Sequence, residues 1–235
     1  MRILVATAVP VERDAVARAF PGAAREVPLP GVTLLRSGGG YDLLAAGVGP
    51  ALAAAFVSAV LTAAAREGTP YRLVVSAGIA GGFLPEAPVG SLVLADAITA
   101  ADLGAETADG FLPVTELGFG TVSHVPPPSL VREAATATGA RRGTILTVST
   151  VTGTAARAAA LRERHPTALA EAMEGFGVAE AAALHGVPVL EMRAVSNPVG
   201  PRDRAAWRIP DALATLTDGF GKLAPVLESW NRHDR

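Results

Sequence analysis

Two glutamates and one asparagine follow segments that predict buried strands, where polar side chains often meet in α/β proteins. Glu12 begins a helix-like segment after a short apolar run, Glu174 lies between apolar residues and glycines, and Asn197 precedes Pro198. A carboxylate can deprotonate water or stabilise a developing positive charge, and an amide offers a donor and an acceptor together. Each also has a structural interpretation: a helix-dipole partner for Glu12, an ion pair for Glu174 and a turn for Asn197.

The types and spacing of the other reactive residues exclude several classes of site. The chain has no cysteine, so a thiol nucleophile, a disulfide and a Cys-ligated metal are excluded. Glycine-rich turns at 47–49 and 78–82 match neither a dinucleotide fingerprint nor a P-loop, and each alone is a structural turn or a close approach to a flat ligand. The histidines show no metal-ligand spacing, so we expect neither a metal nor a cofactor. These histidines are His124, His165, His185 and His233.

Strand-like runs of Val, Ile, Leu and Ala alternate with helix-like segments along the chain. The predicted strands are residues 2–6, 32–36, 43–46, 73–76, 91–97, 143–148, 168–172 and 187–195. The predicted helices are residues 11–20, 51–66, 129–138, 155–164, 176–185 and 211–230, the last capped by Asp211. This alternation predicts a three-layer αβα fold around a mixed, mainly parallel sheet. Residues 102–128 form the longest segment predicted to be irregular.

Composition limits the possible partners. The 235 residues are 50% hydrophobic and 18% charged, which favours a large core in a single domain spanning 1–235. A net charge of −2 gives no field for nucleic acid or an anionic membrane. The uncharged stretch 43–65 could span a bilayer by length, but its glycines, Pro50 and many alanines favour a strand, a turn and a buried helix. A short N-terminal apolar run predicts no signal peptide, so we expect a cytoplasmic protein.

Together these positions resemble the nucleoside phosphorylase/nucleosidase superfamily. The resemblance consists of a first strand leading to Glu12, the turn 76–82, Met173-Glu174 opening a helix, and residues 193–196 ending a strand. The similarity to the methylthioadenosine/S-adenosylhomocysteine nucleosidases extends over nearly the whole chain. Segments 172–177 and 193–203 are similar to those of futalosine hydrolases, which release hypoxanthine from futalosine in a menaquinone pathway.

The resemblance implies cleavage of an N-ribosidic bond through an oxocarbenium-like ribosyl cation. Glu12 would deprotonate the attacking water, Glu174 would bind the ribose hydroxyls, and Asn197 would bind the base. The other implied substrate-binding residues are Ser76, Ala77, Gly78, Thr152, Met173 and Arg193. The implied partner is a small nucleoside, and the relatives imply a homo-oligomer, with a dimer favoured.

Two positions depart from the adenine-releasing relatives. Asn197 replaces an aspartate that protonates the purine, and its amide can instead bond to a 6-oxopurine such as hypoxanthine. No aromatic residue lies near Gly153 to stack on the base, which leaves Phe83 and Phe176 as possible substitutes.

Futalosine carries a benzoate on its 5′ side, so we expect an apolar pocket with one arginine for that carboxylate. Arg202 and Arg208 are the candidates in this chain, although a partner subunit could supply the arginine instead.

Other functions remain open from the sequence. The chain could be a nucleosidase or phosphorylase for another 6-oxopurine nucleoside such as inosine, or a purine-nucleoside-binding module without catalysis. Glu12 favours water over phosphate, because an acid and an anion in one pocket repel each other.

Overall fold

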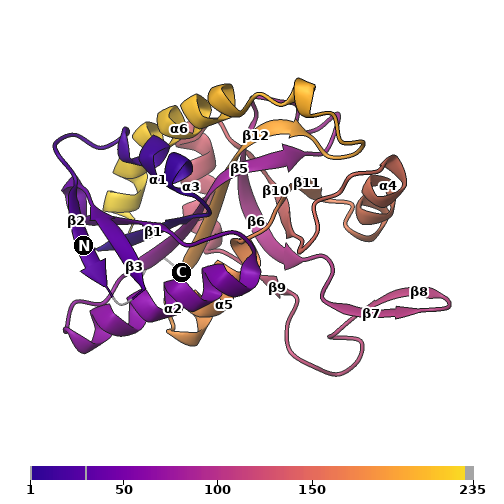
Figure 1. The fold of residues 1–235 in the computed structure, drawn as a ribbon, viewed down its shortest axis with the longest axis horizontal. Helices are drawn as coiled ribbons and strands as arrows, with labels where there is room; N and C mark the ends of the chain where they lie inside the picture. The colour runs from indigo at the N-terminus through magenta and orange to yellow at the C-terminus, as the bar shows by residue number, and fades with distance from the viewer. Residues whose placement is uncertain (1, 30, 231–235) are drawn as a thin grey trace.

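A mixed β-sheet forms the centre of the computed structural model, which describes residues 2–29 and 31–230 (Figure 1). The strands of this sheet run in the order β11-β10-β6-β12-β5-β1-β4-β3-β2, and β9 pairs with β6. Their bounds are β1 Ile3–Thr7, β2 Arg25–Leu29, β3 Val32–Arg36, β4 Tyr41–Ala45, β5 Leu73–Gly82, β6 Leu92–Ala100, β9 Ser123–His124, β10 Arg141–Thr147, β11 Ala168–Ala172 and β12 Val189–Pro198.

Helices cover both faces of the sheet. They are α1 Pro10–Ala17, α2 Pro50–Arg66, α3 Pro128–Thr138, α4 Ala155–Arg164, α5 Gly175–Leu184 and α6 Ile209–Ser229. Apolar residues of α2 and α5 share one buried cluster, and those of α1, α3 and α6 share another. The two clusters lie on opposite faces because alternate residues of a strand point to opposite sides. The predicted three-layer architecture is therefore confirmed.

The central strands β1, β5 and β12 are paired in parallel, so their carboxyl ends meet at one edge of the sheet. All five residues of β1 are buried, as expected for a continuous apolar strand covered on both faces. Glu12 follows β1 by one turn of α1, and Asn197 lies near the end of β12.

The sheet closes on itself at this edge. Strand β11 pairs in parallel with β10 and also, antiparallel, with the end of β5. Residue Gly81 of β5 is in register with Glu171 of β11 on one side and with Asn197 of β12 on the other. The closure brings β11, which the sequence places far from β5, to the edge where Glu12 also lies.

The uncharged stretch 43–65 forms the end of β4, a turn and most of α2, as the sequence predicts. Within residues 2–29 and 31–230, no helix is long and apolar enough to cross a membrane.

Several expected boundaries are wrong. Residues 102–128 are not irregular throughout, because β7 Gly104–Thr107 and β8 Gly110–Pro113 form a hairpin that projects from the body (Figure 1). The sequence also missed β2, whose alternating exposed residues and Pro28 resemble a loop. Helix α6 begins at Ile209 with Arg208 at its N-cap, so Asp211 lies in the first turn and does not cap the helix.

Candidate functional site

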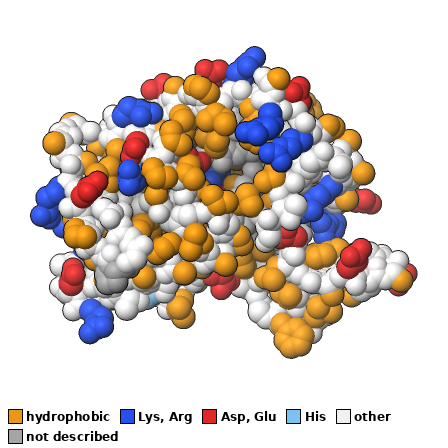
Figure 2. All heavy atoms as spheres, in the orientation of Figure 1, with side chains coloured by type: hydrophobic (Ala, Val, Ile, Leu, Met, Phe, Trp, Pro, Cys, Tyr) orange, Lys and Arg blue, Asp and Glu red, His pale blue; other side chains and the backbone are white. Residues whose placement is uncertain are grey.

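A cavity of about 350 Å³ opens at the edge where β5, β11 and β12 end. Figure 2 shows this face hollowed near its centre, with hydrophobic side chains around the hollow. The cavity brings together Glu12, Glu174 and Asn197, which the sequence separates by up to 185 positions. The residues that line it are Ala8, Glu12, Val48, Ile79, Ala80, Gly81, Val148, Val151, Thr152, Glu171, Ala172, Met173, Glu174, Ser196, Asn197, Val199 and Trp207.

Glu12 is held in place by backbone N–H groups from two segments. Its Oε2 accepts from the amides of Ala8 at 3.0 Å and Val9 at 3.3 Å, and its Oε1 accepts from the amide of Ile79 at 2.8 Å. Burial raises the pKa of Glu12 despite the nearby Arg193 and these amides, because a buried carboxylate loses its hydration. A fixed carboxylate with a raised pKa is suited to take a proton from water near neutral pH.

Gly78 allows Glu12 and Arg193 to approach each other. A Cβ at this position would lie 2.6 Å from Oε1 of Glu12 and 2.8 Å from Nη1 of Arg193. Its φ of 154° also lies in a range that side chains rarely adopt. The packing of this site therefore requires a glycine at position 78. Gly78 lies beneath the cavity and does not line it.

Arg193 lies under the cavity and joins two buried glutamates. Its Nη1 donates to Oε2 of Glu174 at 3.2 Å, and its Nε donates to Oε1 of Glu191 at 2.9 Å. Its Nη2 donates to the hydroxyl of Ser76 at 3.2 Å. The guanidinium is only 1% exposed, so these partners replace its hydration. Arg193 is thus the ion-pair partner that the structural interpretation of Glu174 predicts.

Three carboxylates share this one guanidinium. Burial acts to lower the pKa of Arg193, but Glu191, Glu174 and Glu12 together raise it. Burial raises the pKa of Glu191, which is fully buried, against the opposing effect of Arg193. Three carboxyl groups face one guanidinium here, so the wall next to the cavity is acidic, and a positive charge on a ligand would be stabilised there.

Glu191 fits in this cluster only because residue 175 is glycine. A Cβ on Gly175 would lie 2.2 Å from Oε2 and 2.3 Å from Oε1 of Glu191. The same Oε2 has no hydrogen-bond partner among the described residues. Sequence reasoning missed Glu191, because an acidic residue within an apolar strand gives no sign of the partners that β5 and α5 provide.

Asn197 presents an amide to the cavity in a defined orientation. Its Nδ2 donates to the carbonyl of Pro198 at 3.0 Å, and its Oδ1 accepts from the hydroxyl of Ser196 at 2.8 Å. Because a carbonyl can only accept, the first of these bonds fixes which amide atom is nitrogen. The second N–H of Nδ2 is available to a ligand.

The other predicted residues lie at different depths. Met173 and Thr152 line the cavity, whereas Ser76 and Ala77 are fully buried in β5 below it. The segment of β5 that lines the cavity is Ile79, Ala80 and Gly81, one residue beyond the predicted Gly78.

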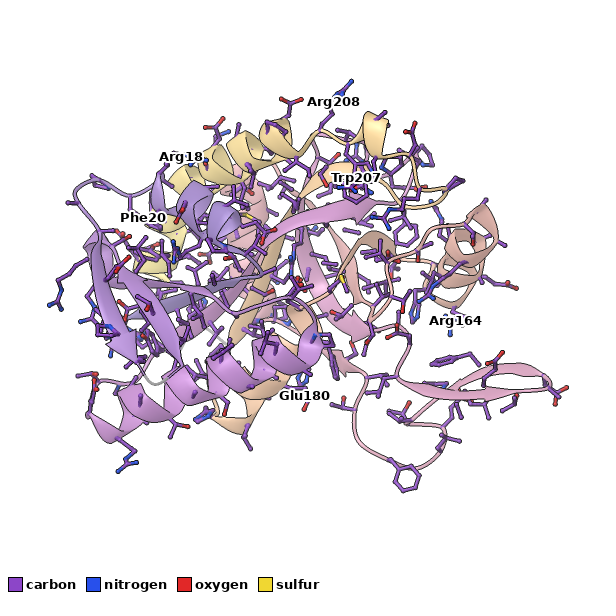
Figure 3. All side chains as sticks on the ribbon, in the orientation of Figure 1. Arg18, Phe20, Arg164, Glu180, Trp207 and Arg208 are labelled. Atoms are coloured by element: carbon purple, nitrogen blue, oxygen red, sulfur yellow. The ribbon has the colours of Figure 1, made fainter. Side chains whose placement is uncertain are left out.

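Trp207 is the aromatic side chain that lines the cavity, and sequence reasoning missed it. It lies on the segment between β12 and α6 (Figure 3). The proposed substitutes for a stacking aromatic are wrong: Phe83 is 1% exposed in a core cluster, and Phe176 packs in another core cluster and against His124, their ring centroids 5.4 Å apart. The position of Gly153 is open, with no atom within 4 Å of an added Cβ.

The arginines considered for a carboxylate do not line the cavity. The guanidinium of Arg202 is 5.8 Å from the centre of the Trp207 ring, and that of Arg204 is 5.9 Å from it. Arg208 is exposed at the N-cap of α6, and its backbone amide donates to the carbonyl of Ser196.

Another hollow, of about 690 Å³, lies between α3 and α5. It is larger, but its lining is mostly proline, alanine and valine, with His124 and Arg132 as its titratable residues. Paired carboxylates line only the smaller cavity of these two, so we assign the chemistry there. Over the described residues, no group of three or more His, Asp or Glu could hold a metal ion, and His233 lies outside them.

Comparison with known proteins shows which family this chain resembles. The sequence model of the family described as "Phosphorylase superfamily" matches residues 3–225. A futalosine hydrolase of Streptomyces coelicolor is 79% identical over 235 residues, which cover 100% of both chains. A futalosine hydrolase of Acidothermus cellulolyticus is 48% identical over 229 residues, covering 94% of this chain and 89% of the relative.

Solved structures share the fold at lower identity. A futalosine hydrolase of Helicobacter pylori superposes with a TM-score of 0.81 at 17% identity, covering 96% of this chain and 97% of the other. A 5′-methylthioadenosine/S-adenosylhomocysteine nucleosidase of Colwellia psychrerythraea, in complex with adenine, has a TM-score of 0.80 at 21% identity, covering 97% and 96%. At these identities the likeness concerns the fold alone.

Proposed function

Because this chain belongs to the phosphorylase superfamily and, within it, to the futalosine hydrolase family, we propose that it hydrolyses the N-ribosidic bond of futalosine. The products would be hypoxanthine and dehypoxanthine futalosine, and the step would serve menaquinone biosynthesis. The observation that carries this proposal is one cavity that holds Glu12, Glu174 and Asn197, in a chain 79% identical along its length to a futalosine hydrolase.

Glu12 is the proposed general base. Three backbone amides aim its carboxylate, so the side chain need not reorganise when it takes a proton from the attacking water. Its raised pKa makes it a stronger base than an ordinary glutamate. A positioned general base contributes about 10²–10⁴ to a reaction rate.

Glu174 is the proposed partner of the ribose. One oxygen accepts from Arg193 and the other from the amide of Gly49 at 3.2 Å, which leaves further lone pairs for two sugar hydroxyls. The negative charge of the Glu12–Glu174–Glu191 cluster lies near the position that a ribosyl cation would occupy. Positive charge that develops in the transition state would therefore be stabilised more than the neutral ground state.

The cavity favours water as the nucleophile over phosphate. Among the described residues that line it, none is lysine or arginine, and Glu12 occupies the place where an anion would have to approach. Arg193 below the cavity is already bonded to Glu174 and Glu191. A phosphate there would meet two carboxylates without an unpaired cation, which is a repulsive arrangement.

The rim around Trp207 is the proposed site of the 5′ benzoate. Trp207 offers an aromatic surface at the cavity, and Arg202 and Arg204 lie near its ring with exposed guanidinium groups. Arginine binds a carboxylate through two parallel hydrogen bonds, so either residue could hold the benzoate. Arg204 joins Arg202 as a candidate because of this position, whereas Arg208 is exposed at the N-cap of α6.

The test is release of hypoxanthine from futalosine by the purified protein in phosphate-free buffer, followed by chromatography of the free base. We expect turnover that added phosphate does not increase. Strict dependence on phosphate would make the protein a phosphorylase. Cleavage of inosine at the same kcat/KM as futalosine would instead indicate a nucleosidase that does not read the 5′ group. Binding of hypoxanthine without turnover of any nucleoside would indicate a non-catalytic module.

A further inference from the structure

Glu171 is a buried carboxylate that lines the cavity and has no part in the reaction described above. Its residue is 5% exposed, and across the described residues no Lys, Arg or His lies within ion-pair distance of it. Burial raises its pKa, against the hydrogen bonds from Thr152 and the charge of Arg157, which lower it. A buried carboxylate without an ion-pair partner is costly, so its position at a ligand cavity calls for a functional explanation.

Glu171 changes the cavity wall at Thr152 from a hydrogen-bond donor to a hydrogen-bond acceptor. The Thr152 amide donates to Oε1 of Glu171 at 2.8 Å, and the Thr152 hydroxyl donates to Oε2 at 2.5 Å. Both donors of this wall are therefore used by the carboxylate. Each carboxylate oxygen retains a second acceptor site, so the wall can accept a hydrogen bond from a ligand, whereas Thr152 alone would donate one.

Glu171 and Asn197 face the cavity from the two edges of β5. Both are in register with Gly81, and residues in register across neighbouring strands point to the same face of a sheet. Their Cα atoms are thus at most about 10 Å apart, twice the spacing of adjacent strands. A Cβ on Gly81 would lie 2.9 Å from Cγ2 of Val199 and 3.4 Å from Nδ2 of Asn197, so the glycine lets both side chains approach β5 between Glu171 and Asn197.

On the basis of the proposed function, we propose that Glu171 is a specificity-determining residue that accepts the ring N1–H of a 6-oxopurine. Asn197 donates from Nδ2 to the neighbouring O6, so the two side chains read adjacent atoms on one edge of the base. Adenine has the opposite pattern at these atoms, because its N1 carries a lone pair and its 6-amino group donates. The lone pair of N1 would face the Glu171 carboxylate, and the amino group would face the Asn197 N–H.

A substrate-ratio experiment tests this assignment. The measurement is kcat/KM for futalosine and for the same nucleoside carrying adenine, in the natural protein and in Glu171→Gln. Glutamine can donate as well as accept, so we expect futalosine cleavage to fall by about 10-fold or more and adenine release to rise. The preference for the 6-oxo base should then shift by about 100-fold. Glu163→Gln, an exposed position on α4, is the matched control and should change neither value.

The outcome separates recognition from a merely structural role. If Glu171 only anchors Thr152, both substrates lose the same factor in Glu171→Gln and the ratio does not move, which overturns the assignment. Failure of the proposed function itself would be seen separately, as absence of hypoxanthine release by the natural protein.

A second measurement needs no variant and therefore does not depend on its folding. Hypoxanthine and 1-methylhypoxanthine are compared as product inhibitors of the natural protein. Because methylation removes the N1 proton, we expect inhibition by 1-methylhypoxanthine to be about 100-fold weaker. Equal inhibition by the two bases would overturn the proposal.

Discussion

Two clusters of buried carboxylate and arginine lie at opposite ends of the same sheet, and they differ in how charge is balanced. At one end, Asp42 accepts from Arg2 at 2.5 Å, Arg36 at 2.8 Å and the hydroxyl of Tyr71 at 2.6 Å. Burial would raise the pKa of Asp42, but the bonds from Arg36, Tyr71 and Arg2 outweigh it and lower the pKa. One carboxylate with two arginines is a satisfied structural ion pair.

At the other end the ratio is inverted. Three glutamates share Arg193, burial raises the pKa of Glu12 and Glu191, and Oε2 of Glu191 has no hydrogen-bond partner among the described residues. Such an arrangement does not minimise the free energy of the unliganded protein, because buried charges that are not fully paired are destabilising. The comparison teaches that the distinction between structure and function lies in the balance of charges and not in burial, since both carboxylate groups are buried.

The largest expected effect comes from the catalytic end. Glu12→Gln keeps the shape of the side chain but removes the base, so kcat for hypoxanthine release should fall by about 10³-fold. Binding of futalosine should fall less than kcat, because the glutamine oxygen can keep the backbone bonds of one Glu12 oxygen, whereas its NH2 group cannot accept those of the other. The measurement is single-turnover base release together with a binding titration. A variant with more than about a tenth of natural kcat would show that Glu12 is not the general base.

The next effect comes from the contact between Gly175 and Glu191. Gly175→Ala places a methyl group within 2.3 Å of both oxygens of Glu191, so it should displace the carboxylate and Arg193 with it. We expect kcat to fall by about 10-fold to 100-fold.

The reciprocal variant tests whether this loss comes from the contact. Glu191→Val in the Gly175→Ala background removes the clash, so the two substitutions should not be additive. The double variant should be more stable to heat than Gly175→Ala alone. Strict additivity in both activity and thermal stability would show that the two residues act independently.

The pH dependence of kcat/KM is the next expected difference between the two ends of the sheet. Glu12 must be ionised to accept a proton, and burial raises its pKa above the ordinary value of 4.5. The acid limb of kcat/KM should therefore lie above pH 4.5, with a loss of about 10-fold for each further unit of pH below it. Asp42→Asn should leave this limb in place, because Asp42 lies at the other end of the sheet. An acid limb at or below pH 4.5 would contradict the assignment of Glu12.

The sequence could predict the positions of these polar site residues, because each lies next to the end of a strand or the start of a helix along the chain. Glu12 after a buried strand, Met173-Glu174 before a helix and Asn197 at a strand end lie at the carboxyl edge, as expected for an α/β sheet. The αβα architecture followed from the same alternation of strands and helices. The roles of these residues in catalysis remain predictions.

The sequence could not predict what depends on register between distant strands. Glu171 and Glu191 are single acids in apolar strands. The bond of Glu171 to Thr152 depends on how β11 aligns with β10, and the contacts of Glu191 with Ser76 and Gly175 depend on how β12 packs against β5 and α5. Trp207 lies in a segment without periodicity, so nothing indicated that it reaches the cavity. The hairpin of β7 and β8 was missed because each strand is only four residues long and contains glycine or proline, which are typical of loops.

The smallest effect on activity, and the clearest contrast, is expected from Asp42→Asn. The substitution leaves Arg2 and Arg36 without a counter-charge, and because both arginines are partly exposed we expect a loss of about 2 kcal/mol of unfolding free energy at pH 7. The pKa of Asp42 is lower in the folded protein than the ordinary value of 3.8, so its contribution is complete above pH 3.8 and disappears as the pH falls through the lowered folded value. Urea unfolding of both proteins from pH 7 to acid should therefore show a difference that shrinks only below about pH 4. With kcat/KM unchanged within about twofold, the Asp42 cluster would be purely structural, whereas a large loss of kcat would mean that the two ends of the sheet are coupled.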